Sequence, residues 1–270
     1  MYSAHTLRFL RSVRARTAIA RYALSTGLQS LRSDFGVLRA MLRGIPQNGS
    51  HAQNLQGFYG TQADDYDRFR ERLLHGRAEL ITRLRLALPR AAHVVELGGG
   101  TGRNLEFFDT ALEDIAAFDL VDLCPALLAR ARTRLARHAQ VRVVEADATT
   151  FRPAQPVDCV YFSYALTMIP DWRAALDNAI AMLKPGGMLG VVDFYHSAAR
   201  PDAGLVHHSA FTRHFWRRWF AHDGVRLDPE HLATLRARLP QHELTESRAA
   251  VPYLPGIRVP YYVFVGRTPA

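Results

Sequence analysis

Residues 93–104 read His-Val-Val-Glu-Leu-Gly-Gly-Gly-Thr-Gly-Arg-Asn, an apolar run that ends in Glu96 and passes into a cluster of glycines. The pattern predicts a buried strand, a tight turn and a helix that begins near Thr101. Gly98, Gly100 and Gly102 lack a Cβ atom, so a ligand can lie against their main chain, and they permit the positive φ of a reversing turn. A ligand-binding turn is therefore predicted, with a plain strand–helix connection as the alternative.

The spacing of these glycines separates several kinds of nucleotide-binding turn. No Gly-Lys-Ser or Gly-Lys-Thr follows, which excludes a phosphate-binding loop. In the order Glu-x-Gly-x-Gly-x-Gly the last glycine stands one residue earlier than in the dinucleotide fingerprint. This order resembles that of S-adenosyl-L-methionine (SAM) methyltransferases. SAM is therefore the predicted cofactor, and the first residues predicted to bind it are Glu96, Gly98, Gly100 and Gly102.

A second apolar run, residues 115–121, ends at Asp122, twenty residues after Gly102. This is where α/β nucleotide-binding units place the carboxylate that binds the ribose. The alternative is that Asp122 caps the helix predicted to begin at Pro125. Leu123, which follows it, joins the predicted cofactor site.

Two later runs, residues 141–146 and 157–161, also lead to side chains that can bind a ligand. Asp147, followed by Ala148, is expected to accept a hydrogen bond from the adenine amino group. Because parallel strands bring their carboxyl ends to one edge of a sheet, Ser163 and Tyr164 are predicted at the same edge. The strands and the helices between them predict an α/β, Rossmann-like fold.

The remainder of the chain completes this prediction. Helices are expected over residues 71–88, 102–110, 125–138, 171–183 and 229–239, and strands over 188–193, 243–249 and 260–266. Residues 58–270 are predicted as the catalytic domain, with 196–226 as an insertion near the substrate. Its aromatic residues, interleaved with arginines, are expected either to meet lipid headgroups or to pack against the sheet.

Composition limits the function classes. The 270 residues are 48% hydrophobic and 22% charged, as expected for one globular domain with appendages. Two cysteines give no disulfide framework. The twelve histidines show no His-Glu-x-x-His, and Cys-x-x-Cys is absent, so no metal is predicted. A formal charge of +9 indicates an anionic partner or surface, or simply aids solubility.

The charge is concentrated at the start of the chain, where residues 1–44 hold eight arginines against Asp34, a net charge of 8 − 1 = +7. Apolar residues lie between the arginines, a pattern typical of a helix on an anionic membrane, an organelle transit peptide, or a hairpin packed on the domain. Residues 45–57 are predicted as a linker. No apolar run reaches the length of about 18 residues that a membrane-spanning helix needs, so a cytoplasmic, peripherally membrane-associated protein is expected.

The segment just before the first strand is a predicted lid over the cofactor. Tyr59, Tyr66 and Arg70 are expected to offer hydroxyls and a guanidinium to the methionine carboxylate of SAM. The alternative is an amphipathic helix with aromatic packing.

Several stretches between Phe58 and Arg267 resemble the methyltransferase part of betaine lipid synthases, which N-methylate diacylglycerylhomoserine. The stretches that carry the resemblance are Phe58-Tyr59, Gln62-Ala63, Tyr66-Asp67, Leu97–Gly102, Val121–Cys124, Val144–Ala148, Phe162–Pro170, Asp193–Tyr195, His214–Arg218, Val251–Tyr253 and Pro260–Arg267. The resemblance implies a class I SAM-dependent methyltransferase, a three-layer sandwich whose mostly parallel seven-stranded sheet has an antiparallel last strand. It further implies three methylations of the headgroup amine, with a separate enzyme to supply the lipid substrate.

Four residues are predicted to serve the chemistry. Tyr164 and Tyr195 follow two strands and are expected to offer aromatic faces to the methylated cation, while Asp193 or His196 takes protons in the earlier rounds. Another amphiphile, such as a quinone, or a small molecule is the alternative acceptor. A nucleic-acid methyltransferase is disfavoured, because Phe-Ser-Tyr-Ala stands where amino-directed base methylases carry Asp/Asn-Pro-Pro-Tyr.

Overall fold

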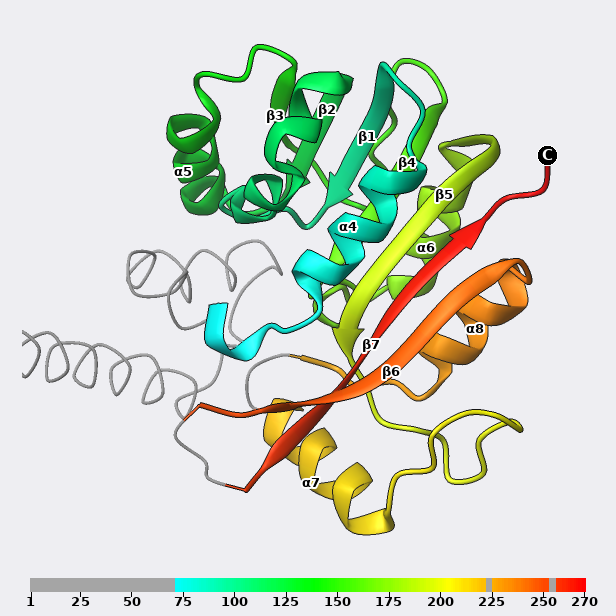
Figure 1. Cartoon of the computed structure of the whole chain (residues 1–270). Coiled ribbons are helices and arrows are strands. Elements are labelled where there is room, and N and C mark those ends of the chain that lie inside the picture. Colours follow the sequence, from blue (N-terminus) through cyan, green and yellow to red (C-terminus); the bar gives the residue numbers. More distant parts are fainter. Residues whose placement is uncertain (1–70, 222–224, 253–255) are drawn as a thin grey trace, which may run out of the picture.

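The computed structural model describes residues 71–221, 225–252 and 256–270 of the chain. Its centre is a seven-stranded sheet in the order β3-β2-β1-β4-β5-β7-β6 (Figure 1). The strands are β1 (Ala92–Leu97), β2 (Ile115–Asp122), β3 (Val141–Glu145), β4 (Val157–Ser163), β5 (Leu183–Phe194), β6 (His242–Ala250) and β7 (Arg258–Arg267). The first five run parallel, and β7 is antiparallel to both β5 and β6. This confirms the predicted Rossmann-like methyltransferase fold with its antiparallel last strand.

Helices cover both faces of the sheet and make three layers. The layer on one face contains α4 (Arg77–Ala87), the 3-10 helix η1 (Arg103–Asp114) and α5 (Pro125–Leu135), and the other contains α6 (Trp172–Ala181) and α8 (Glu230–Arg238) (Figure 1). Two buried apolar clusters fill the spaces, one under α4 and η1 and one under α6 and α8. Strands buried on both faces explain the nearly continuous apolar runs in the sequence.

Two helices differ from the predicted ones. The stretch predicted as one helix over residues 71–88 is broken at Gly76, which has φ +79° and precedes α4. A Cβ atom there would lie 2.7 Å from the Tyr261 ring, so this position needs glycine both for conformation and for space. The segment after the glycine turn is a 3-10 helix with a non-helical residue, Asp109, rather than the expected α-helix.

The fifth strand also begins earlier than predicted. β5 includes the Lys-Pro-Gly-Gly run at residues 184–187, which the sequence indicates as a turn. The pairing with β4 jumps from Leu183 to Met188 there, so the run forms an irregular bulge at the strand's start. Thr268 holds this bulge, because its Oγ1 donates to the Lys184 carbonyl at 2.9 Å.

The predicted insertion, residues 196–226, contains α7 (Ala210–Ala221) between β5 and α8. Figure 1 shows α7 beyond the carboxyl ends of the parallel strands, at the lower end of the view. None of the helices within the described ranges is long and apolar enough to cross a bilayer. The predicted basic segment 1–44 and linker 45–57 lie outside the described residues.

Candidate active site

The glycine turn after β1 is held between β2 and the segment that follows β4. The N–H groups of Gly98 and Gly99 both donate to the Val121 carbonyl, at 2.8 and 3.0 Å. Gly98 has φ +75°, and a Cβ atom built on it would lie 2.4 Å from the Ala165 Cβ. Gly100 and Gly102 also have positive φ, at 56° and 72°. The protein therefore packs so closely against this turn, and its backbone is so turned, that only glycine fits there.

Asp122 lies at the end of β2, directly beside this turn. Its Oδ2 accepts a hydrogen bond from the Gly100 N–H at 2.8 Å, and its Oδ1 accepts one from the Cys124 N–H at 2.8 Å. The N-cap residue of α5 is Cys124, and because its N–H donates to Asp122, the carboxylate lies just before the start of this helix. The carboxylate is only half-buried, and it orients the glycine turn while facing the carboxyl edge of the sheet.

The ends of β3 and β4 complete this edge. Oδ1 of Asp147 accepts from both the N–H and the hydroxyl of Thr149 at 2.8 Å, which fixes the carboxylate in a turn. Ala148, the next residue, is buried in the apolar cluster under α6 and α8, and its place against the adenine stays a prediction. Leu123 packs with Met168 in a small apolar cluster that spans the same edge.

Three observations fit SAM to these residues. The turn presents a main chain without side chains, because Gly98, Gly100 and Gly102 all have positive φ. Two carboxylates, Asp122 and Asp147, stand at neighbouring strand ends as acceptors for hydroxyl and amino groups. The Ser163 hydroxyl is buried without a hydrogen-bond partner within the described ranges, which leaves a polar atom for a ligand to satisfy.

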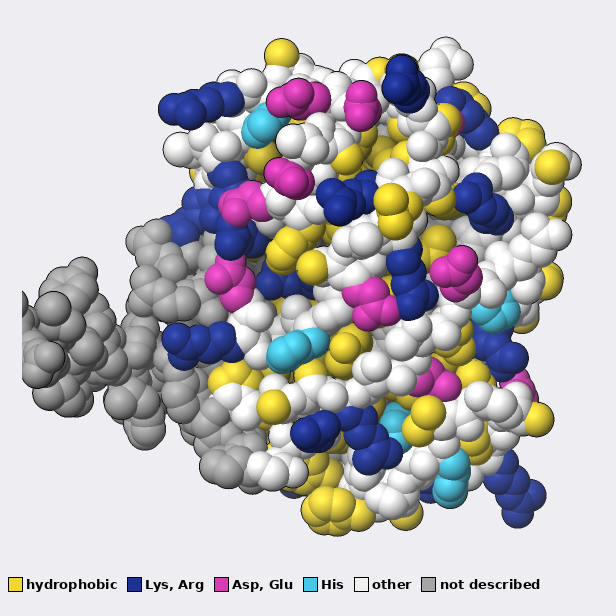
Figure 2. Space-filling view, in the orientation of Figure 1, with side chains coloured by type: hydrophobic (Ala, Val, Ile, Leu, Met, Phe, Trp, Pro, Cys, Tyr) yellow, Lys and Arg dark blue, Asp and Glu magenta, His cyan; other side chains and the backbone are white. Residues whose placement is uncertain are grey.

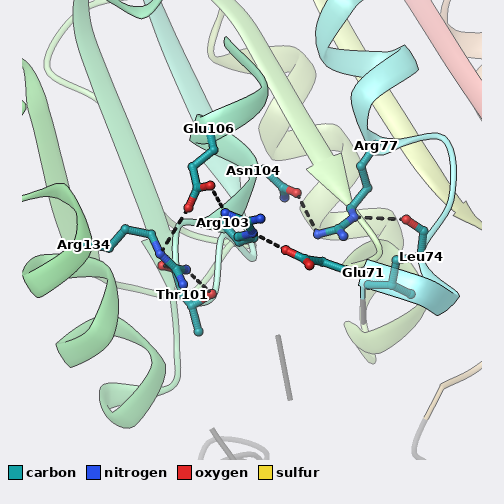
Figure 3. A network of polar contacts seen from close by, with 8 residues as sticks. All are labelled: Glu71, Leu74, Arg77, Thr101, Arg103, Asn104, Glu106 and Arg134. Carbon is teal, nitrogen blue, oxygen red and sulfur yellow. Dashed lines mark hydrogen bonds and ion pairs between the residues drawn. The ribbon is translucent and has the colours of Figure 1, made fainter. Parts of the chain in front are cut away.

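Glu96 occupies a different place from the one expected for a cofactor ligand. It is fully buried in β1, and the Asn104 amide donates to its Oε1 at 2.6 Å. Asn104 in turn accepts from the Arg77 guanidinium at 3.3 Å, while the Arg77 Nε donates to the Leu74 carbonyl (Figure 3). Glu96 thus supports the turn from inside the fold and links it to α4.

A set of ion pairs lies on the outer side of the glycine turn. Arg103 pairs with Glu71 and Glu106, and Arg134 of α5 lies 3.6 Å from Glu106 (Figure 3). The Arg134 guanidinium also donates to the carbonyl and the hydroxyl of Thr101, each at 2.8 Å. Sequence reasoning missed Asn104, Arg77 and Arg134, because nothing in their local pattern shows which long side chains turn inward.

Tyr164 lies close to the glycine turn. It directly precedes Ala165, which packs on Gly98, and its own backbone has φ +55°. Its hydroxyl donates to the His75 carbonyl at 2.6 Å, and its ring packs on Phe194 with centroids 4.6 Å apart. The ring is therefore held as part of a wall at the end of β4.

Tyr195 and Asp193 do not pack with Tyr164, and their predicted roles in the chemistry stay predictions. Side chains alternate along a strand, so Asp193 and Tyr195 point to the face opposite Phe194. The Tyr195 hydroxyl donates to Glu246 of β6 at 2.6 Å, and burial raises the pKa of this tyrosine above its ordinary range. Tyr195 is thus a packing residue of the α6 and α8 side.

Asp193 links β5 to the segment after β4 through hydrogen bonds, and it is not an exposed base. Its carboxylate accepts from the Thr167 hydroxyl at 2.8 Å, the Thr167 N–H at 3.1 Å and the Phe194 N–H at 2.8 Å. Asp193 is fully buried, and this burial raises its pKa to about 7.

This raised pKa predicts a pH dependence of stability. Between about pH 4 and pH 7 the native state binds more protons than the unfolded chain, so the free energy of unfolding falls as the pH rises through this window. Asp193→Asn removes this titration. Between pH 4 and pH 7 the free energy of unfolding of the variant should therefore rise relative to that of the wild type, by a few kcal/mol at most. Urea unfolding at a series of pH values measures this, and parallel pH profiles of the two proteins would contradict it.

His196, the other predicted proton acceptor, begins the segment after β5. Its Nδ1 lies 3.0 Å from the Ser197 carbonyl, which assigns the proton to Nδ1. Its Nε2 is buried and has no hydrogen-bond partner among the residues that the structure describes. A proton-accepting role for this nitrogen stays a prediction.

The predicted lid residues Tyr59, Tyr66 and Arg70 lie outside the described residues. In the described ranges no group of three His, Cys, Asp or Glu side chains is placed to hold a metal ion. The structure thus brings the three glycines of the turn together with Leu123, Tyr164 and four polar or small residues at one sheet edge, namely Asp122, Asp147, Ala148 and Ser163.

Comparison with known proteins agrees with this geometry. A family model described as a methyltransferase domain matches residues 66–238. A trans-aconitate 2-methyltransferase of Methylobacterium radiotolerans is 35% identical over 126 residues, 47% of this chain and 46% of that protein. A ubiquinone/menaquinone biosynthesis C-methyltransferase of Enterobacter sp. is 32% identical over 117 residues, 42% of this chain and 46% of that protein. Each match spans less than half of the relative's length.

One solved structure shows how far the fold is shared. The N-methyltransferase NodS from Bradyrhizobium japonicum, in complex with S-adenosyl-L-homocysteine, superposes with a TM-score of 0.61 at 20% identity. The superposition covers 82% of this chain and all of that one.

Proposed function

The chain belongs to the methyltransferase domain family and is a SAM-dependent methyltransferase, and we propose that its acceptor is the amine of a lipid headgroup. The substrate proposed is diacylglycerylhomoserine, methylated in three successive steps to its trimethylated betaine form. A separate enzyme would supply this lipid, and the basic segment 1–44 would bring the chain to an anionic membrane.

The observation that carries the proposal is the aromatic wall beside the glycine turn. The rings of Tyr164 and Phe194 pack at a tilt of 59° with centroids 4.6 Å apart, and Phe220 of α7 stacks on Phe194 at 4.6 Å. Because Ala165 packs on Gly98, the wall is anchored next to the turn that is predicted to bind the cofactor. Apolar π faces at this place suit an acceptor that becomes a quaternary cation and carries acyl chains.

The reaction needs little acid–base catalysis from the protein. SAM supplies an electrophilic methyl group, and the attacking amine forms the new N–C bond as the methyl–sulfur bond breaks. An amine with a pKa of about 8 or 9 is neutral in a useful minority of molecules at neutral pH, so it loses its proton to water between rounds. The wall around Tyr164 contributes alignment and stabilises the final cation, which has no N–H to donate.

A second candidate acceptor is the carboxylate of a small acid. It is supported by the 35% identity to a trans-aconitate 2-methyltransferase and by basic residues after β5. The Arg213 guanidinium donates to the His208 carbonyl at 2.5 Å, and burial, with the charge of Arg248, lowers the pKa of His208 to about 4. His208 is therefore uncharged at neutral pH, whereas the cations Arg213 and Arg248 favour an anionic acceptor, a feature that homoserine lipids and tricarboxylates share.

Methyl-labelled SAM distinguishes the candidates. The purified protein is incubated with total lipid extract, with a quinone fraction or with trans-aconitate, and the products are separated by chromatography. Label that migrates with a polar lipid and stays on the water-soluble headgroup after mild alkali has removed the acyl chains supports the amine, because a methyl ester would release its label as methanol. Label only in an alkali-labile small acid would replace the proposal by the second candidate.

A further inference from the structure

Helix α7 has an unusual composition for a helix of this domain. Its sequence, Ala-Phe-Thr-Arg-His-Phe-Trp-Arg-Arg-Trp-Phe-Ala, contains five aromatic residues, three arginines and one histidine, with no acidic residue. Trp216 and Phe220 are buried against the sheet side. The helix therefore has more aromatic residues than its buried stripe uses.

The remaining aromatic residues form a continuous path from solvent to the wall. Phe211 stacks on Phe215 at 5.8 Å, and Phe215 stacks on Trp219 at 5.7 Å. Phe215 also meets Trp216, which contacts Phe220, the ring that stacks on Phe194. Contacts between rings thus connect the outer end of α7, through the buried Trp216 and Phe220, with the proposed acceptor wall.

The outer end of this path is open and basic. Phe211 is 78% exposed, whereas the other rings of the path are partly or fully buried. Arg218 stands seven residues after Phe211, so it lies on the same side of the helix, whereas Arg217 lies about a third of a turn away from Phe211. Both arginines are exposed, and neither forms an ion pair or side-chain hydrogen bond within the described part of the chain. Figure 2 shows hydrophobic side chains along the lower edge of the molecule, over α7.

We propose that the outer face of α7, formed by Phe211, Phe215 and Arg218 with Arg217 at its edge, docks on an anionic lipid bilayer and places the acceptor wall at the membrane surface. Aromatic rings beside arginines are the combination found at membrane–water interfaces. The inference rests on the proposed lipid acceptor.

Charge distinguishes between the partners that could cover this face of α7. Residues 1–44 carry a net charge of 8 − 1 = +7, so they are repelled by a helix that has only cations. A second copy paired through α7 would bring the same arginines together. An anionic bilayer complements both the arginines and the exposed ring.

Vesicle binding by the full-length protein tests the proposal. Vesicles of phosphatidylcholine, with or without phosphatidylglycerol, are mixed with protein at low salt, without SAM or acceptor, and the bound fraction is measured by sedimentation. Phe211→Ser should lower the partition constant about tenfold on anionic vesicles. Arg217→Gln with Arg218→Gln should lower it roughly 25-fold, at about fivefold per arginine.

Leu86→Ser is the matched control, because Leu86 is 79% exposed and lies on α4. It should bind as the wild type does. Equal binding by Phe211→Ser and Leu86→Ser, or a wild type that ignores anionic vesicles, would overturn the proposal. So would a dimer that Phe211→Ser dissociates while vesicle binding is unchanged. Because no acceptor is present, failure here is distinct from failure of the methylation assay.

A fluorescence readout locates the contact. Phe211→Trp keeps an aromatic ring and should keep vesicle binding, with additional quenching by brominated lipids relative to the wild type. Unchanged quenching would show that the exposed end of α7 stays in water, and that would also overturn the proposal.

Discussion

Asp122→Ala is expected to weaken the affinity for SAM and for S-adenosyl-L-homocysteine by about a hundredfold, or roughly 3 kcal/mol. The change removes the acceptor expected to bind the ribose hydroxyls. It also removes the carboxylate that accepts from the Gly100 and Cys124 N–H groups at 2.8 Å, so the glycine turn loses its orientation. Isothermal titration calorimetry measures the loss directly.

The same strand offers a matched control for this change. Asp114 stands just before β2, at the end opposite to Asp122, and is exposed. Asp114→Ala should leave cofactor affinity unchanged. Asp122→Asn keeps one acceptor oxygen and should fall between the wild type and the alanine variant. Wild-type affinity in Asp122→Ala would remove this residue from the cofactor site.

Tyr164→Leu is expected to stall the reaction after the first methylations, with loss of most of the trimethylated product. Leucine keeps an apolar side chain in the wall but has no π face, so the growing cation loses an attraction of about 2 kcal/mol in a desolvated site. Tyr164→Phe should keep most of the product, because only the hydroxyl bonded to the His75 carbonyl is lost. Mass spectrometry of the mono-, di- and trimethylated lipids gives the ratios.

Two outcomes would assign Tyr164 another role. Full trimethylation by Tyr164→Leu would make the residue a packing element of the wall. Loss of all products in Tyr164→Phe would show that the hydroxyl, through its bond to the segment before α4, sets the geometry of the site. Cofactor affinity and the thermal midpoint of each variant separate these effects from unfolding.

The parts of the site that the sequence predicted are those that local pattern determines. The glycine turn and Asp122 are close in sequence, and each follows an apolar strand, so their meeting at one edge follows from parallel pairing. The antiparallel β7 came instead from the family resemblance, and the order of the strands was not predicted. Nothing in the apolar runs shows that β7 inserts between β5 and β6.

The parts that the sequence missed depend on contacts between distant segments. Gly76 breaks a predicted helix because Tyr261 of β7 occupies the space of a Cβ atom. The alternation after Val191 already indicated that Asp193 and Phe194 face opposite sides of β5. The face that Tyr164 joins was not predictable, because its positive φ is rare for a tyrosine and arises from the packing of the surrounding residues.

The most direct test of the proposed reaction uses purified full-length protein, diacylglycerylhomoserine in mixed vesicles, and SAM whose methyl group carries deuterium. Mass spectrometry should show mono- and dimethylated intermediates early and then a lipid that has gained three deuterated methyl groups on nitrogen. The Asp122→Ala variant should give little of it at the same SAM concentration. An unmodified homoserine lipid, together with rapid methylation of trans-aconitate in a parallel reaction, would contradict the lipid-amine account.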